Sequence, residues 1–359
     1  MKRNLLFAAL ASVAFAGCVN EDVTEMVKGK PLTFGSPVMY TQTKNVIGEI
    51  QGTTYPTNEK FTVFAVEHNG DFAGWEAANI VKNEDGTGYF PATGETVTNN
   101  GNHWYTANSY YLPQETEHKL SFAAYSPARA AVKDSINYGE NGLLIKGWTM
   151  PNTDHYDLMY SERTINVTES PVPIKFYHAL ASLRFKFVKA TAAEGGPYSV
   201  IINKVLLLTG SNFNNVGTFE TRTTTDNIIG SPRWQDLKNV SSPASFLLIS
   251  DSYEVTTTSS EIANIRSFLP IPQNVTSDMK LALDYSIVQA EGETAHKVHL
   301  EIPLTHFLLA GSTEHTTAWE MGKRYVYHVH FGALTKIAFA PSIGSDWVTV
   351  ENAGTYTIK

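Results

Sequence analysis

The chain has 359 residues, a formal net charge of −8 and a single cysteine. This acidic balance argues against a nucleic-acid partner, because nucleic-acid affinity comes largely from cationic contacts to phosphate. One cysteine excludes an internal disulfide, a thiolate metal cluster and a redox pair, so stability must come from burial. The length suggests two domains, and a charged fraction of only 17% with abundant aromatic residues favours an all-β fold.

The N-terminus reads as an export signal. Lys2 and Arg3 precede an apolar run from Leu5 to Gly17, which is too short for a permanent membrane helix but typical of a signal peptide. The run ends in Phe-Ala-Gly before Cys18, a sequence similar to a lipobox. We therefore expect residues 1–17 to be a lipoprotein signal peptide and Cys18 to carry the lipid. An ordinary signal peptide that leaves Cys18 free is the alternative.

Residues 18–30 are expected to form a tether. Glu21 and Asp22 closely follow the cysteine, and acidic residues at this place resemble the surface-export signal of some Gram-negative lipoproteins. A solvated tether explains them equally well.

From Lys30 onward, short alternating segments are separated by clusters of Gly, Asn, Pro and Thr, which indicates sandwiches or barrels rather than helices. Turn chemistry marks loops between these segments, since Asn and Gly tolerate positive φ. The loops are expected at Asn99–Gly101, Gly195–Pro197 and Asn212–Asn215. The expected strands are Leu32–Phe34, Phe61–Val66, Leu120–Tyr125, Ser182–Val188, Val200–Leu208, Ser245–Leu248, Lys280–Ile287, Lys297–Pro303 and Tyr325–Phe331.

The segment Glu162–Pro173 has few residues that can be buried and precedes a new run of strands, so it is the predicted domain boundary. The two predicted domains are an N-terminal β-sandwich at 31–168 and a C-terminal β-sandwich at 169–359.

Four histidines stand at spacings that bear on metal binding. His328 and His330 alternate on an expected strand and would face one side about 6.6 Å apart. The opposite face is apolar, so an ordinary amphipathic strand explains both of them better than a metal does. His296 and His299 should fall on opposite faces, with no carboxylate at a supporting interval. No metal site is predicted.

No catalytic residue is predicted either. His178 lies between apolar residues and reads as a partly buried histidine bonded to backbone. Asp154-His155-Tyr156-Asp157 reads as a loop, since no serine in a nucleophile-elbow context accompanies it. The glycines are scattered at turns, so no phosphate-binding loop and no cofactor are expected.

Three stretches resemble the fimbrillin family, the type V pilins of the Bacteroidia and their tip and anchor relatives. Phe176–Phe185 is similar to a Phe-x-His-Ala-Leu segment that leads into a strand, and Trp319–Tyr327 is similar to a Trp and Gly pair before a Tyr-rich strand. Ile337–Pro341 followed by Trp347 is similar to the closing segment of the family.

This resemblance implies two tandem transthyretin-like β-sandwich domains, export as a lipoprotein to the outer membrane and a pilus subunit that assembles by donor-strand exchange. Other pilin subunits would be its partners, with a host protein or glycan as a further candidate. The released first strand would include Leu32, Phe34, Val38 and Tyr40. Stalk pilins of the family are cut after an Arg that follows this strand, whereas here the matching region offers Lys44.

Two implications stay open. Either a protease that accepts lysine acts at Lys44, or the protein keeps its first strand and serves as a cap or anchor. Val348–Ile358 would be either the donated strand or, slightly favoured, the last strand of the second sandwich.

The main alternative function is that of a surface glycan-binding lipoprotein with an exposed aromatic platform. A secreted hydrolase is a third possibility, which would need paired carboxylates in a cleft. The aromatic residues that could form the platform are Trp75, Trp104, Tyr105, Tyr110, Tyr111 and Trp148.

Overall fold

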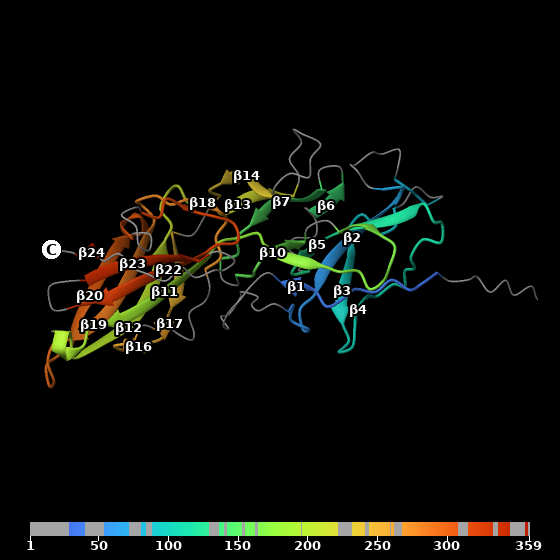
Figure 1. Cartoon of the computed structure of the whole chain (residues 1–359). Coiled ribbons are helices and arrows are strands. Elements are labelled where there is room, and N and C mark those ends of the chain that lie inside the picture. The colour runs from blue at the N-terminus through green and yellow to red at the C-terminus, as the bar shows by residue number, and fades with distance from the viewer. Residues whose placement is uncertain are drawn as a thin grey trace, which may run out of the picture.

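The computed structural model is all-β, as the sequence predicts, and its only described helices are two single-turn 3₁₀ segments, η3 (Ala192–Glu194) and η4 (Leu304–His306). Figure 1 shows an elongated molecule with the N-terminal strands at one end and the C-terminal strands at the other. The structure describes residues 29–39, 54–71, 80–83, 88–128, 136–139, 142–152, 155–161, 164–194, 196–221, 232–240, 244–258, 260–261, 268–307, 315–332, 337–344 and 356–357.

The N-terminal sheet has a mixed strand order that brings the start of the chain beside residues from its middle. β1 pairs in parallel with β10, whereas the other pairs on the main path are antiparallel, and β9 (Thr164–Val167) pairs with β5 beside it. The order is β1 (Val38–Met39), β10 (Lys175–His178), β8 (Met159–Ser161), β5 (His118–Ser126), β2 (Phe61–Asn69), β3 (Glu95–Asn99) and β4 (Trp104–Thr106).

A second sheet, here called the middle sheet, joins strands that are far apart in the sequence. β13 pairs antiparallel with β7, although about 70 residues separate them, and Tyr160 of β8 contacts Phe219 of β13 with ring centroids 5.0 Å apart. The middle sheet therefore packs on the outer face of the N-terminal sheet. Its order is β14 (Arg233–Lys238), β13 (Val216–Glu220), β7 (Gly142–Thr149) and β6 (Ile136–Gly139).

Two further sheets form the C-terminal sandwich. Tyr285 of one contacts Phe331 of the other, with ring centroids 5.1 Å apart. The first sheet has the order β17 (Ser260–Glu261), β11 (Ser182–Lys189), β22 (Arg324–Phe331), β23 (Ile337–Gly344) and β24 (Tyr356–Thr357). The second has the order β15 (Ser245–Ile249), β12 (Ser199–Leu208), β19 (Lys280–Val288) and β20 (His296–Pro303), with β16 (Tyr253–Glu254) also on β12.

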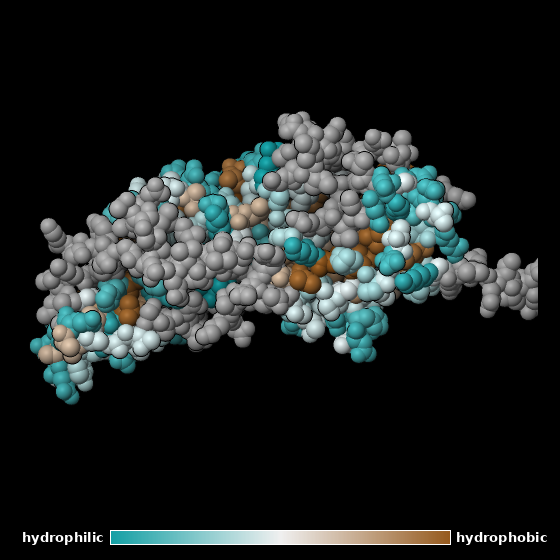
Figure 2. Space-filling view, viewed as in Figure 1, coloured by the Kyte–Doolittle hydropathy of each residue, from teal (hydrophilic) through white to brown (hydrophobic). Residues whose placement is uncertain are grey.

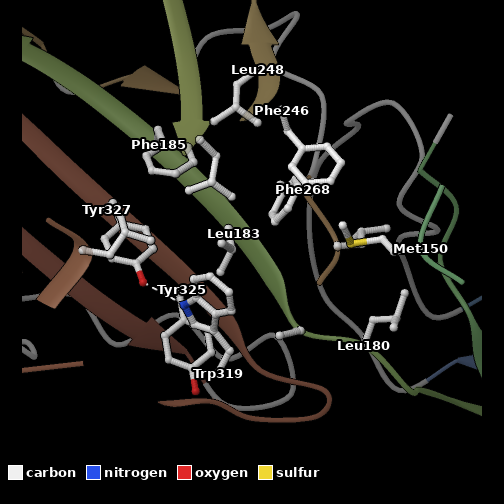
Figure 3. Packing of buried hydrophobic residues seen from close by; sticks show 14 of the residues in the cluster. Met150, Leu180, Leu183, Phe185, Phe246, Leu248, Phe268, Trp319, Tyr325 and Tyr327 are labelled. Atoms are coloured by element: carbon white, nitrogen blue, oxygen red, sulfur yellow. Dashed lines mark hydrogen bonds between the residues drawn. The ribbon is translucent and has the colours of Figure 1, made fainter. Parts of the chain in front are cut away.

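The core of this sandwich is formed by every second residue of β11 and β22. Leu183 and Phe185 of β11 are buried and lie in register with Tyr325 and Tyr327 of the parallel strand β22. Figure 3 shows these side chains around Trp319, whose indole N–H donates to the hydroxyl of Tyr327 at 2.9 Å. Trp319 belongs to the small pair β18 (Gln273–Asn274) and β21 (Ala318–Trp319).

The predicted strands are confirmed in eight of nine places. The exception is Leu32–Phe34, where the structure has isolated bridges at Pro31 and Phe34 instead of a continuous strand. The domain limits at 168 and 169 stay a prediction, and strand pairing continues across them because β10 pairs with β8 and β13 pairs with β7.

Replacing Leu183, which is fully buried, by Ala should lower the free energy of unfolding by about 2–5 kcal/mol, because a cavity would remain in the packed core. Chemical denaturation of purified protein that begins after Cys18 would measure the change. Leu247→Ala is the matched control, since Leu247 is 51% exposed and should change stability by less than about 0.5 kcal/mol. Equal effects of the two substitutions would contradict the described packing.

Candidate assembly groove

Residues 30–39, here called the first segment, lie against both edges of the N-terminal sheet. On the β4 side, the backbone N–H of Leu32 donates to the carbonyl of Tyr110 at 2.8 Å. The N–H of Phe34 donates to the carbonyl of Trp104 at 3.1 Å. These bonds give the edge of β4 a backbone partner.

The same segment pairs on its other side with the residues that lead into β10. The N–H of Gly35 donates to the carbonyl of Val172 at 2.9 Å, and the N–H of Val172 donates back to the carbonyl of Thr33 at 2.8 Å. Farther along, the N–H of Val38 donates to the carbonyl of Ile174 at 3.0 Å. The first segment therefore joins the β10 edge to the β4 edge and closes the sheet on itself.

The side chains of the first segment fill the interior that this closure creates. Leu32, Phe34 and Met39 are all buried, with exposures of 6%, 2% and 2%. The ring of Phe34 meets Phe61 and Phe122 edge to face, at centroid distances of 6.2 and 6.0 Å. Burial of each such side chain contributes roughly 1.5–3 kcal/mol, so this short segment is a large part of the local core.

The alternation of buried and exposed side chains along the first segment shifts by one residue at Gly35 and Ser36. Leu32 and Phe34 point inward, but farther on Met39 is buried and Val38 is 52% exposed. Figure 2 shows hydrophobic residues at the surface in the part of the molecule where Figure 1 labels β1 and β10. Of the predicted strand residues, Leu32 and Phe34 thus lie in the core and Val38 lies at the surface.

Three predicted site residues, Cys18, Tyr40 and Lys44, lie outside the described residues. The structure does describe what flanks residues 40–53. Val38 and Thr54 form an antiparallel bridge, so the described residues on the two sides of 40–53 lie next to each other. A cut within 40–53 would leave the first segment attached to the rest of the body by noncovalent contacts alone.

The polar groups beside the first segment are engaged with one another. A carboxylate oxygen of Glu95 accepts from the hydroxyl of Tyr110 at 2.6 Å and from the side-chain amide of Asn108 at 3.0 Å. Burial, together with this carboxylate, raises the pKa of Tyr110 to about 12. The phenol therefore stays neutral at physiological pH, and the groove offers apolar surface and backbone groups instead of reactive side chains.

The structure pairs two residues that the sequence analysis kept apart. Nδ1 of His178 lies 2.7 Å from a carboxylate oxygen of Asp157, and both side chains are buried. His178 was expected to bond to backbone, and Asp157 was expected only as part of a loop. The two lie 21 residues apart, but β10 and β8 are paired, with His178 opposite Met159. No short motif could have signalled this contact.

The prediction that His299 lacks a supporting carboxylate is wrong. Asp284 lies opposite His299 in the β19–β20 pair, and Nδ1 of His299 is 2.6 Å from its carboxylate. This hydrogen bond raises the pKa of His299 above its usual value. His328 and His330 are half-buried and lie opposite the face of Tyr325, Tyr327, Val329 and Phe331, as expected, but Arg324 and Val326 on the histidines' own face are also buried.

One group among the described residues has a composition suited to a cation. Ligand atoms of Glu67, Glu115 and His118 lie within 4.8 Å of one another, and Nδ1 of His118 is 2.7 Å from Glu67. Sequence analysis missed this group because Glu67 comes from β2 and His118 from β5. The short distance fits a direct hydrogen bond between His118 and Glu67, and Glu115 is largely exposed.

Those of the aromatic residues proposed for glycan binding that the structure describes do not form an exposed platform. Trp104 and Trp148 are buried, with exposures of 2% and 3%, whereas Tyr105 is 37% exposed. Tyr110 and Tyr111 are half-buried, and Trp75 lies outside the described residues. The two described tryptophans of this set are core residues.

None of the described helices is long and apolar enough to cross a membrane.

Residues 49–347 match the fimbrillin-like family, and no curated protein sequence matches. A fimbrial protein from Bacteroides vulgatus has a similar structure, with a TM-score of 0.53, 18% identity, and coverage of 87% of this chain and 99% of that one. Proteins assigned to cell adhesion from Bacteroides uniformis and Bacteroides ovatus give TM-scores of 0.47 and 0.48 at 13% and 16% identity, covering 89% and 90% of this chain and 98% and 99% of theirs.

The family match covers most of the sequence, so the chain belongs to the fimbrillin-like family. This confirms the resemblance read from the three sequence stretches. The chain is accordingly a pilus subunit of a structural family, and it acts with other pilin subunits in an appendage on the cell surface.

Phe34→Ala should loosen the first segment, because truncation of a buried phenylalanine typically costs about 3–5 kcal/mol. Hydrogen exchange of the amides of Leu32 and Val38, which are bonded to Tyr110 and Ile174, should become faster. Val38→Ala is the control, since Val38 is half exposed and should leave exchange of the Leu32 amide unchanged. Unaltered exchange in Phe34→Ala would mean that the ring does not hold the segment in place.

Proposed function

We propose that this pilus subunit is exported as a lipoprotein on Cys18 and is assembled by donor-strand exchange at the groove now occupied by the first segment. The observation that carries the proposal is the two-sided pairing of residues 30–39 with the β4 and β10 edges. A single strand that completes both a backbone network and an apolar core can be exchanged for an equivalent strand of another subunit.

Loss of the first segment would leave backbone groups without partners and apolar surface exposed. The carbonyls of Trp104, Tyr110 and Ile174 would lose their donors, and the N–H of Val172 would lose its acceptor. The core would lose Leu32, Phe34 and Met39 at the same time. An extended peptide with apolar residues at the inward positions satisfies both needs, as in other strand-addition complexes.

Processing at Lys44 would prepare this groove. The bridge between Val38 and Thr54 places the two flanks of residues 40–53 side by side. Proteolysis within 40–53 would therefore break the covalent link between the first segment and the rest of the body without cutting a described strand. A subunit that keeps its first segment would instead end or anchor the fibre. The choice between stalk, tip and anchor therefore depends on whether Lys44 is cut.

The ends of the chain supply the remaining parts of the proposal. Residues 1–17 would be the signal peptide, and lipid on Cys18 would hold the protein at the outer membrane before or after assembly. β24 pairs with β23 at the edge of a C-terminal sheet, which favours 348–358 as a last strand over a donor in the free subunit. The body would correspond to tandem transthyretin-like sandwiches at 31–168 and 169–359.

Limited trypsin treatment should remove the first segment from the purified protein and yield oligomers. Mass spectrometry should find a cut after Lys44, and size-exclusion chromatography should show the growth of oligomers from the clipped chain. A synthetic peptide of residues 30–40 should block that growth by refilling the groove, and the same peptide with Phe34→Asp should not.

Lys44→Ala is the control for the site of the cut, because it should stay monomeric under the same treatment. Clipped chains that never oligomerise would contradict strand exchange. An uncut, resistant monomer would assign the protein to an anchor or tip role.

Cys18→Ser should abolish attachment of the lipid, since a hydroxyl does not replace the thiol as acceptor. In a Gram-negative host that processes lipoproteins, incorporation of labelled palmitate should fall to background, and the protein should leave the membrane fraction. Label retained by the Cys18→Ser protein would show that this cysteine is not the anchor. The wild-type chain expressed in parallel controls for export.

A further inference from the structure

A cavity of about 680 Å³ lies between β14 and the β18–β21 pair, away from the assembly groove. In Figure 1 these strands lie in the middle of the molecule, where the middle sheet approaches the C-terminal sandwich. The volume is within the range typical of small-molecule sites, about 300–1,000 Å³. None of its lining residues has a role in the strand exchange proposed above.

The rim of the cavity is held in place by hydrogen bonds. The side chain of Gln273 accepts from the backbone N–H of Asn214 at 2.7 Å and donates to the carbonyl of Asn214 at 3.0 Å. Gln273 itself is buried, and the neighbouring Trp319 is fixed by its bond to Tyr327. The cavity is therefore preformed, which lowers the entropic cost of binding.

One wall is aromatic and apolar. Trp234 is oriented by its indole N–H, which donates to the carbonyl of Ala179 at 2.6 Å. Its ring lies close to Gly217, where a Cβ atom would come within 3.0 Å of the ring, so glycine makes room for this position. Leu237 and Met321 extend the apolar lining.

The polar lining consists mainly of amides. Asn212, Asn214 and Asn274 line the cavity. An amide side chain both donates and accepts, which matches the hydroxyl groups of a sugar. The combination of an indole with amide side chains suits a ligand that has apolar C–H faces and many hydroxyls.

The charged residues of the lining are already paired. Nε of Arg233 is 2.6 Å from a carboxylate oxygen of Glu220, and Glu320 is 2.6 Å from Nζ of Lys323. An anionic or cationic ligand would have to compete with these partners. The lining therefore favours a neutral ligand.

An extended peptide fits this place less well than a sugar. Strand addition needs a regular edge, and the outer strand β14 is interrupted by Asp236, which has a φ of 52° where the pairing with β13 shifts register. Bulges and charged residues at an edge discourage pairing with another strand.

We infer that this cavity binds a neutral saccharide, with Trp234 as the stacking surface and Asn212, Asn214 and Asn274 as hydrogen-bonding groups. The site would give the pilus subunit an adhesive function of its own. It goes beyond strand exchange and does not depend on it, because binding can be measured on the monomer before any proteolysis.

The test begins with an array of neutral and sialylated host-type oligosaccharides, followed by calorimetry with the neutral oligosaccharide that gives the strongest signal. Asn212→Ala and Asn274→Ala should each weaken its binding about three- to tenfold, the equivalent of one lost hydrogen bond. Trp234→Ala should weaken it more than tenfold, with unfolding curves used to confirm that the variant is folded. Asn102→Ala, at an exposed turn of the N-terminal sheet, is the matched control and should bind as the wild type does.

The absence of binding to any neutral oligosaccharide at millimolar concentration would overturn the inference. So would binding that survives the double substitution Asn212→Ala and Asn274→Ala in a folded protein. Selective binding of sialylated sugars would overturn it too, because the ligand would then be charged. Binding of an extended peptide that these substitutions abolish would likewise assign the cavity to another ligand class. Failure of the proteolysis and oligomerisation experiment would leave this result untouched.

Discussion

The backbone groups at the two open edges of the N-terminal sheet need partners, and this requirement governs the arrangement of that part of the protein. Ten residues meet the need on both sides, through Leu32 and Phe34 toward β4 and through Gly35 and Val38 toward the residues that precede β10. The same residues place three apolar side chains in the interior. Backbone pairing at both edges and burial of apolar side chains in the interior thus depend on the first segment alone.

The proposed assembly function follows from that dependence. A segment that is essential to the closed sheet, yet linked to the body through residues 40–53, can be replaced by a strand of similar shape from a neighbour. The proposed sugar site is built differently, from side chains on β14, β18 and the loop that ends at Asn215. Polymerisation and recognition would therefore use separate parts of the molecule, and occupation of one need not obstruct the other.

Many of the strands can be predicted from the sequence, because apolar and polar residues alternate along a strand that has one buried face. In β22, Tyr325, Tyr327, Val329 and Phe331 are buried, whereas His328 and His330 on the other face are half-buried. The predicted strand has nearly the observed bounds. The three stretches that resemble fimbrillins likewise identified the family. The single cysteine after an apolar run carried the expectation of a lipid anchor.

Contacts between distant residues could not be predicted in this way. Asp284 meets His299, and Asp157 meets His178, only because particular strands are paired, and pairing partners are not encoded in local periodicity. The phase change that buries Met39 and exposes Val38 follows from the backbone path through Gly35 and Ser36. The cavity beside Trp234 cannot be predicted for the same reason, since its walls come from four separate stretches of sequence.

The pairing of β7 with β13 has a mechanical consequence. These strands come from opposite sides of the predicted domain limit and are joined by lateral hydrogen bonds within one sheet. A fibre under tension would pull the ends of each subunit apart, and this shared sheet would have to shear before the halves could separate. The subunit would then resist stretching as one continuous body, and would not extend like two beads on a string.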